Sequence, residues 1–157
     1  MSKTTPATAA LTKAGIAFET AIYDYDPDAD RVGLQAAEAL GVSPSIVLKT
    51  LMAEVDGKPV CVVVPSDDEV NMKKLAAAFG GKSARMMKPA DAERLTGYKV
   101  GGISPFGQKK QVQTCVEELA CLHDECFLNG GQRGLQIRIK PDDLIAALGG
   151  KAADLIR

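Results

Sequence analysis

The sequence predicts a single α+β domain over residues 1–157, with a mixed, mostly antiparallel and barrel-like sheet surrounded by short helices. Three observations lead to this prediction. About six or seven strand-length segments alternate with about four or five short helical ones. Asp56-Gly57 separates two apolar runs, which is a strong hairpin signal. No internal repeat, linker or low-complexity segment interrupts the chain, and its 157 residues suffice for one domain with its own core.

The N-terminal half predicts two helices, a strand and the hairpin. Thr5-Pro6 begins a helix, with proline at the first helical position, and Gly15 ends it. Residues 16–23 alternate in polarity and predict a half-buried strand with Tyr23 on its less apolar face. A second helix is expected over residues 34–40, and strands over residues 46–52 and 60–64 flank the hairpin turn.

The C-terminal half predicts shorter elements separated by glycine-rich turns. Asn71 caps a helix that Gly80-Gly81 ends. The later segments are, in order, a strand at 82–87, a helix at 89–95, strands at 113–116, 125–128 and 135–139, and a helix at 141–148.

Composition and charge exclude several classes of function. Hydrophobic residues make up 46% and charged residues 25% of the chain, the balance of an ordinary globular protein. The net charge of −1 argues against a general nucleic-acid coat or a polybasic membrane binder, so any RNA contact must come from a local basic patch. The sequence shows neither a signal peptide nor a membrane span, and we expect a cytoplasmic protein.

Few residues offer the usual groups of metal or nucleophilic chemistry. The four cysteines, Cys61, Cys115, Cys121 and Cys126, lack the C-x2-C spacing of a zinc site, even with His123 nearby. We therefore expect free thiols, no metal and no cofactor. His123 is the single histidine and lies outside the glycine-rich loops, so we expect no histidine-activated nucleophile.

An acidic run after the first strand resembles a calcium loop only at its start. Asp24, Asp26, Asp28 and Asp30 alternate as the first ligands of such a loop would. Ala29 then stands where the turn needs glycine, and Gln35 where a bidentate glutamate is required. The run therefore predicts a solvated acidic loop without calcium.

Lys49 and Tyr23 each allow a structural and a functional interpretation. Lys49 interrupts an apolar strand, where its ammonium must reach either water or an anion. It is a solvent-seeking lysine on an open sheet face or an anion ligand at a pocket wall. Tyr23 is an aromatic residue at a strand edge or a phenol that faces a pocket.

Two glycine-rich loops are the main candidates for a binding site. The first is Gly101-Gly102-Ile103-Ser104-Pro105-Phe106-Gly107-Gln108-Lys109-Lys110, and the second is Asn129-Gly130-Gly131-Gln132-Arg133-Gly134. Successive backbone N–H groups in such loops can hold an oxyanion or a phosphate, and the basic side chains add positive charge. Composition alone also allows plain flexible connections.

Residues 46–51, residues 95–110 and residues 130–135 together resemble the YbaK family of free-standing aminoacyl-tRNA deacylases, which is related to the editing domain of prolyl-tRNA synthetases. The resemblance covers nearly the whole chain in one unbroken order. It implies a single α+β domain with a barrel-like sheet. It further implies removal of cysteine wrongly attached to tRNA(Pro), and of cysteine on tRNA(Cys) as a second candidate.

The same resemblance implies roles for particular residues. Lys49, Gly101 and Gly102 are the expected catalytic residues. Those expected to bind the substrate are Tyr23, Val32, Thr50, Ser104, Pro105, Asn129, Gly130, Gly131 and Gln136. Lys109, Lys110 and Arg133 are expected to contact tRNA phosphates. The chain departs from the family at Val32, Asn129 and Gln136, where an aromatic residue, a serine and an aspartate are usual.

The implied mechanism needs no histidine. The thiol of the substrate cysteine attacks its own ester carbonyl and leaves as a cyclic thiolactone, an intramolecular step that mainly requires positioning. The expected partners are the acceptor end of aminoacylated tRNA(Pro) and, because the net charge does not favour tight RNA binding, prolyl-tRNA synthetase. Two alternatives stay open: a deacylase for alanyl or seryl esters, and a non-catalytic acceptor-end or nucleotide binder.

Overall fold

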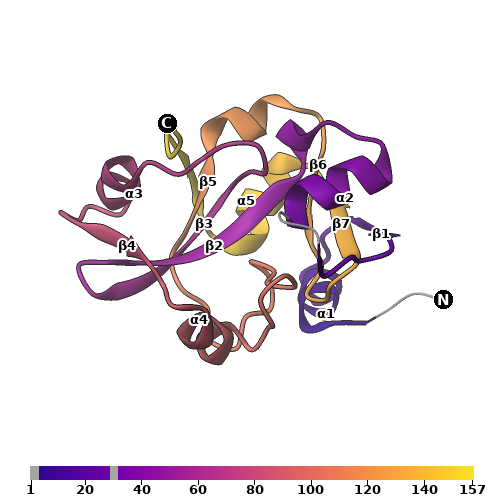
Figure 1. The fold of residues 1–157 in the computed structure, drawn as a ribbon, viewed down its shortest axis with the longest axis horizontal. Helices are drawn as coiled ribbons and strands as arrows, with labels where there is room; N and C mark the ends of the chain where they lie inside the picture. Colours follow the sequence, from indigo (N-terminus) through magenta and orange to yellow (C-terminus); the bar gives the residue numbers. More distant parts are fainter. Residues whose placement is uncertain (1–3, 29–31) are drawn as a thin grey trace.

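The computed structural model describes residues 4–28 and 32–157, and the helices follow the expected order (Figure 1). The α-helices in these ranges are α1 (Pro6–Lys13), α2 (Val32–Leu40), α3 (Met72–Ala78), α4 (Pro89–Thr96) and α5 (Pro141–Leu148). The described residues also contain two 3-10 helices, η1 (Pro44–Ile46) and η2 (Glu118–Leu122). The expected caps form: Thr5 and Thr8 make a capping box on α1, and Asn71 accepts two backbone N–H groups of α3.

The strands form two sheets. They are β1 (Glu19–Ile22), β2 (Leu48–Val55), β3 (Lys58–Pro65), β4 (Ala84–Met86), β5 (Thr114–Glu117), β6 (Cys126–Asn129), β7 (Leu135–Ile139) and β8 (Lys151–Ala153). One sheet has the order β1-β7-β6, and the other β4-β2-β3-β5-β8. Figure 1 shows the turn of the long β2–β3 hairpin pointing away from the β6–β7 pair, with α3 near β4 and α4 beneath β2 in this view.

The α+β class and the mostly antiparallel pairing are confirmed, whereas a closed barrel is not seen among the described strands. Only β3–β5 and β5–β8 are parallel ladders. The two sheets meet through an isolated parallel bridge between Val47 and Phe127. The predicted hairpin is also confirmed, since Val55 pairs with Lys58 and both turn residues have positive φ, 49° at Asp56 and 83° at Gly57.

One predicted strand face was wrong. Ile22 is 56% exposed, whereas Tyr23 is only 7% exposed. Ile16 and Phe18, before β1 begins, pack against the main core. Within β1 and just beyond its end, the more buried side chains are instead those of Ala21 and Tyr23. The alternation therefore shifts by one residue along the segment, and β1 is an edge strand that tolerates an exposed isoleucine.

The acidic run is consistent with a solvated loop. Asp24, Asp26 and Asp28 are exposed, and the Asp26 backbone N–H donates to the Gln35 side chain at 2.8 Å. Ala29 and Asp30 lie outside the described residues. No helix in the described ranges is long and apolar enough to cross a membrane.

Candidate active site

A cavity of about 390 Å³ lies where β2, the β4–α4 segment, the start of α2 and both glycine-rich loops meet. Six expected site residues line it: Val32, Lys49, Thr50, Gly101, Asn129 and Gln136. They come from five separate parts of the chain, so only the tertiary fold brings them together. The other lining residues are Gly33, Leu48, Leu51, Met52, Ser66, Met86, Met87, Pro89, Ala92, Val100 and Ile103.

The first half of β2 offers its backbone to this cavity. β4 pairs with β2 only from Ala53 to Val55, and the Met87 N–H donates to the Met52 carbonyl at 3.1 Å just beyond that ladder. Backbone groups of alternate strand residues point to the same side. The N–H and C=O of Thr50 therefore face away from β3, past the end of β4, on the side where Pro89 and Ala92 form the opposite wall.

Lys49 brings the positive charge of the cavity wall. It is half-buried and lies opposite Val64 of β3. Burial raises the pKa of Asp68, Asp67 and Glu117 add to the rise, and the Lys49 ammonium opposes it. The ammonium thus lies within electrostatic range of a carboxylate outside the cavity lining. The Lys49 ammonium is therefore not an isolated cation, and its role as a ligand of a bound anion stays a prediction.

The first glycine-rich loop is tightly braced and is not a flexible connection. Gly97 ends α4 in the left-handed conformation, with φ 83°. The Tyr98 hydroxyl donates to the Phe106 carbonyl at 2.6 Å across the loop. Inside the loop, Ser104 is fully buried, and its carbonyl accepts the Gln108 side-chain amide at 3.0 Å. This bracing gives the cavity wall at Gly101 a fixed backbone geometry.

Gly102 contributes close packing, because its N–H is already engaged. That N–H donates to the Lys99 carbonyl at 2.8 Å. A Cβ at Gly102 would lie 3.0 Å from the Arg133 nitrogen and 3.2 Å from the Gln132 carbonyl carbon. The absent side chain therefore lets the two glycine-rich loops touch backbone to backbone. Of the two expected donors, the N–H of Gly101, on the cavity wall, is the one with no partner among the described residues.

Asn129 and Arg133 hold the two loops together. The Asn129 amide donates to the Gly101 carbonyl at 3.0 Å, while its oxygen accepts the N–H groups of Gly131 at 2.7 Å and of Gln132 at 3.1 Å. Arg133 donates to the Val100 carbonyl from Nε at 2.9 Å and from a terminal nitrogen at 2.7 Å. Its guanidinium also lies 5.6 Å from the ring centre of Tyr25. Arg133, expected at a phosphate, is thus already a loop brace.

Two buried oxygen atoms of the lining lack a partner. Thr50 Oγ1 and Gln136 Oε1 are inaccessible to solvent and accept or donate no hydrogen bond within the described part of the chain. The Gln136 side chain is 2% exposed and stands on β7, between Ala21 of β1 and Asn129 of β6. Buried polar atoms are normally paired, so two unpaired ones around one cavity indicate a ligand-binding role.

The remaining expected residues lie outside the cavity lining. Tyr23 packs in a cluster with Ala36, Ala37, Val47 and Phe127, and burial, followed by the nearby Tyr25, raises its pKa. An interaction of its hydroxyl with the Gly134 backbone opposes this rise. Lys109 and Lys110 are exposed at the end of the first loop. The other expected site residues that do not line the cavity lie within the two glycine-rich loops; they are Gly102, Ser104, Pro105, Gly130 and Gly131.

Sequence reasoning missed the wall built by β4 and α4. Met86 ends β4, and it lines the cavity with Met87, which follows, and with Pro89 and Ala92 of α4. The signal available in the sequence was the pair of adjacent methionines before a proline. Met86 is 41% exposed, which is uncommon for a large apolar side chain and fits a binding surface better than a core.

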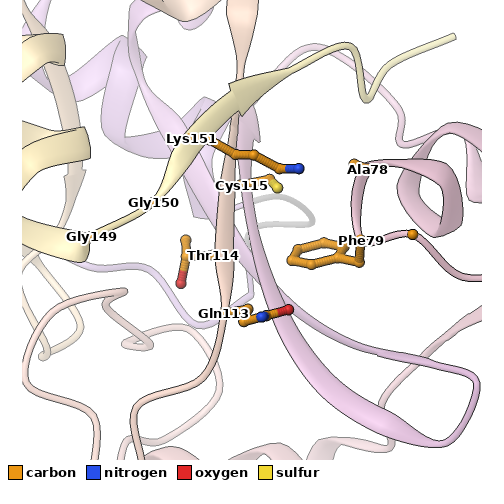
Figure 2. Close-up of a pocket in the computed structure, with 9 residues that line it drawn as sticks. Ala78, Phe79, Gln113, Thr114, Cys115, Gly149, Gly150 and Lys151 are labelled. Atoms are coloured by element: carbon orange, nitrogen blue, oxygen red, sulfur yellow. The ribbon is translucent and has the colours of Figure 1, made fainter.

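A second cavity of about 460 Å³ is larger but offers less chemistry (Figure 2). It lies between the end of α3, β5 and the start of β8, and Figure 2 shows Lys151, Cys115 and Phe79 around it. None of the expected site residues lines it, and none of its described side chains holds a buried polar atom without a partner. We therefore place the candidate site in the smaller cavity.

The cysteines and histidine lie away from the candidate site. Cys61, Cys115 and Cys126 are buried free thiols, Cys121 is half-buried, and none lines the cavity. Burial raises the pKa of Cys61 and of Cys126 to about 12. His123 is exposed after η2. Within the described ranges, no group of three or more histidine, cysteine or acidic side chains could hold a metal ion.

Comparisons with known proteins point to one family and one fold. The profile of the aminoacyl-tRNA editing domain matches residues 26–147. The "Putative Cys-tRNA(Pro)/Cys-tRNA(Cys) deacylase EbsC" of Enterococcus faecalis is 35% identical over 136 residues, which cover 85% of this chain and 82% of that protein. A proline--tRNA ligase of Limosilactobacillus fermentum is 34% identical over 89 residues, 54% of this chain and 16% of the ligase. A solved "putative trans-editing enzyme for prolyl tRNA synthetase" shares the fold, with a TM-score of 0.86 and 24% identity over 99% of both chains.

Proposed function

Because the chain belongs to the aminoacyl-tRNA editing domain family, we propose that it removes cysteine wrongly attached to tRNA(Pro), and also cysteine on tRNA(Cys), as a free-standing deacylase. The observation that supports this most is the cavity itself. Lys49, Gly101 and two unpartnered buried oxygens surround a space of about 390 Å³, within the segment that the family profile matches. Such a pocket suits a small aminoacyl ester.

The lining favours a reaction assisted by the substrate. Its described residues include no histidine, cysteine, aspartate or glutamate, so no general base of the usual kind is at hand. The thiol of the bound cysteine supplies the nucleophile: its thiolate sulfur bonds to the ester carbonyl carbon. The bond from that carbon to the ribose oxygen then breaks, the ribose oxygen takes up a proton, and a thiolactone leaves.

The protein's contribution in this scheme is position and charge. The Gly101 N–H, whose loop is braced by Asn129, is the backbone donor for the oxyanion. The Lys49 ammonium stabilises the negative charge that develops on the carbonyl oxygen or on the neighbouring phosphate. Lys109 and Lys110, exposed at the end of the loop, meet phosphates of the acceptor end. The net charge of −1 favours action together with a synthetase such as prolyl-tRNA synthetase.

A deacylation panel with Cys-tRNA(Pro), Cys-tRNA(Cys), Ala-tRNA(Pro) and Ser-tRNA(Pro) tests the proposal. We expect the cysteinyl esters to be cleared at least about tenfold faster than the seryl ester, because a thiol ionises near neutral pH and a hydroxyl does not. A preference for the alanyl or seryl ester would reject the thiol-assisted scheme and favour a deacylase for those esters. The absence of turnover on all four would leave a non-catalytic acceptor-end binder.

A further inference from the structure

The two buried oxygens of the cavity lining, Thr50 Oγ1 and Gln136 Oε1, each lack a hydrogen-bond partner within the described residues. A buried polar atom without a hydrogen bond destabilises a fold, and functional sites tolerate such an atom where a bound ligand supplies the missing partner. Gln136 Oε1 can only accept a hydrogen bond, and Thr50 Oγ1 can accept one or donate one. A ligand group that satisfies the Gln136 oxygen must be a hydrogen-bond donor, and one that satisfies both oxygens as acceptors needs more than one proton to offer.

The position of Gln136 within the fold narrows the identity of that group. Gln136 is almost fully buried on the central strand of the three-stranded sheet, away from the exposed loop residues Lys109 and Lys110. A tRNA cannot enter the cavity, so the nucleotide stays at the mouth and the amino-acid end meets the buried lining. The donor that every amino acid offers at that end is its α-amino group.

We propose that Gln136 and Thr50 form a subsite for the α-amino group of the aminoacyl end, an inference that rests on the proposed function. Asn129 cannot take this role, because both ends of its amide are engaged with the two loops. Gln136 is held in register by β1 on one side and β6 on the other, so its backbone position at the cavity is fixed before the ligand arrives. Thr50 stands on the part of β2 that β4 leaves uncovered.

The subsite recognises the amine through neutral acceptors. The described lining holds the Lys49 ammonium and no carboxylate, so recognition rests on hydrogen bonds to two fixed oxygens and not on an ion pair. An aminoacyl end without its amine leaves both oxygens unpaired. Sites built to bind a polar group reject analogues that lack it, because their buried polar atoms then stay unsatisfied.

A binding experiment with two stable probes tests the subsite without any need for turnover. The probes are adenosine with alanine joined to its 3′ position through an amide, and the matching propionyl amide, which lacks only the amine. Calorimetry with the wild-type protein should show at least about tenfold tighter binding of the alanyl probe. Gln136→Leu, close in volume to the wild-type residue, should reduce this preference to within about twofold, and Thr50→Val should reduce it in part.

The controls separate a binding role from a structural one. Gln113→Leu changes an exposed glutamine outside the cavity and should keep the full preference. Gln136→Leu should melt at or above the wild-type temperature, because an unpaired buried amide is replaced by an apolar side chain. If Gln136→Leu does not fold, Thr50→Val and the two-probe comparison in the wild-type protein still decide. Equal binding of both probes by the wild-type protein, or an undiminished preference in Gln136→Leu, overturns the subsite.

Turnover of Cys-tRNA, measured in parallel, separates this inference from the proposed function. If the wild-type protein deacylates Cys-tRNA yet binds both probes equally, the proposed function stands and the subsite proposal is rejected. If the protein prefers the alanyl probe through Gln136 but deacylates none of the substrates, the subsite proposal stands and the proposed function is rejected. A protein that neither binds the probes nor deacylates overturns both.

Discussion

Replacing Gly102 by alanine should weaken catalysis through the contact between the two glycine-rich loops. The added Cβ would lie 3.0 Å from the Arg133 nitrogen and 3.2 and 3.3 Å from two atoms of the Gln132 backbone. Ordinary contacts between such atoms lie at about 3.5–4.0 Å, so the loops must separate by a few tenths of an ångström. The second loop cannot yield easily, because Asn129 holds the N–H groups of both Gly131 and Gln132.

The size of the effect follows from this geometry. Overpacking of this kind costs about 1–3 kcal/mol, and in a chain of this length each kcal/mol lowers the melting temperature by about 2–4 °C. Gly101, on the cavity wall, moves with its neighbour. A displacement of about 1 Å in a catalytic group costs about a hundredfold in rate, so a shift of a few tenths should cost about threefold to tenfold in deacylation.

Gly41→Ala is the matched control. Gly41 has a φ of 70° but nothing within 4 Å of its added Cβ, so alanine there costs about 1–2 kcal/mol of backbone strain without moving the loops. Thermal melting and single-turnover deacylation of Cys-tRNA(Pro) should show similar destabilisation in both variants and slower deacylation in Gly102→Ala alone. Full activity in Gly102→Ala, or an equal loss of activity in Gly41→Ala, would refute the reasoning.

Four further outcomes are expected. Lys49→Ala should lower deacylation at least about tenfold with a shift in melting temperature below about 4 °C, and a near-wild-type rate would contradict its role. His123→Ala should keep the rate within about twofold, whereas an inactive, folded variant would show that the enzyme has its own base. Thiols have a pKa of about 8.5 in the unfolded chain, whereas those of Cys61 and Cys126 have a pKa of about 12 in the folded protein. The unfolded state therefore loses these protons first, and the urea concentration at the unfolding midpoint should fall as the pH rises between the two values. A midpoint that does not change over this pH range would contradict the prediction. The Glu117 carboxylate accepts the N–H of buried Leu155 and, in a part-buried hydrogen bond, that of Leu119, and Glu117→Gln leaves one of them without its acceptor. Urea unfolding should therefore show a loss of about 1–3 kcal/mol while deacylation persists.

Local rules predicted the parts of this fold that local chemistry determines. The Thr5-Pro6 start, the Asn71 cap and the Asp56-Gly57 turn all form where the sequence indicates. β8 was missed because Lys151-Ala152-Ala153 has no strand pattern of its own, and its pairing comes from the parallel ladder with β5. The inward side of Tyr23 was missed because one edge strand serves two packing environments in succession.

The candidate site was predictable as a set of residues but not as a geometry. Lys49 could be singled out because a charge in an apolar strand needs an explanation, and the glycine runs because they leave backbone exposed. The engagement of the Gly102 N–H, the brace from Arg133 and the methionine wall depend on segments that are distant in sequence. Hydrophobic periodicity contains no information about such neighbours.

The pairing of β1 with β7 has a consequence for how the protein is made. Glu19 faces Arg138, and the Thr5 hydroxyl donates to the Gly130 carbonyl at 2.5 Å, so the first elements of the chain are completed by segments more than a hundred residues later. Contacts of such high order form late, because the entropy of closing a long loop is lost before the contact is gained. During synthesis on the ribosome, the β2–β3 hairpin can form early, whereas Gln136 joins Lys49 only after β7 has emerged. A nascent chain therefore lacks this cavity until β7 has left the ribosome, and its earlier apolar strands wait for their partners until then.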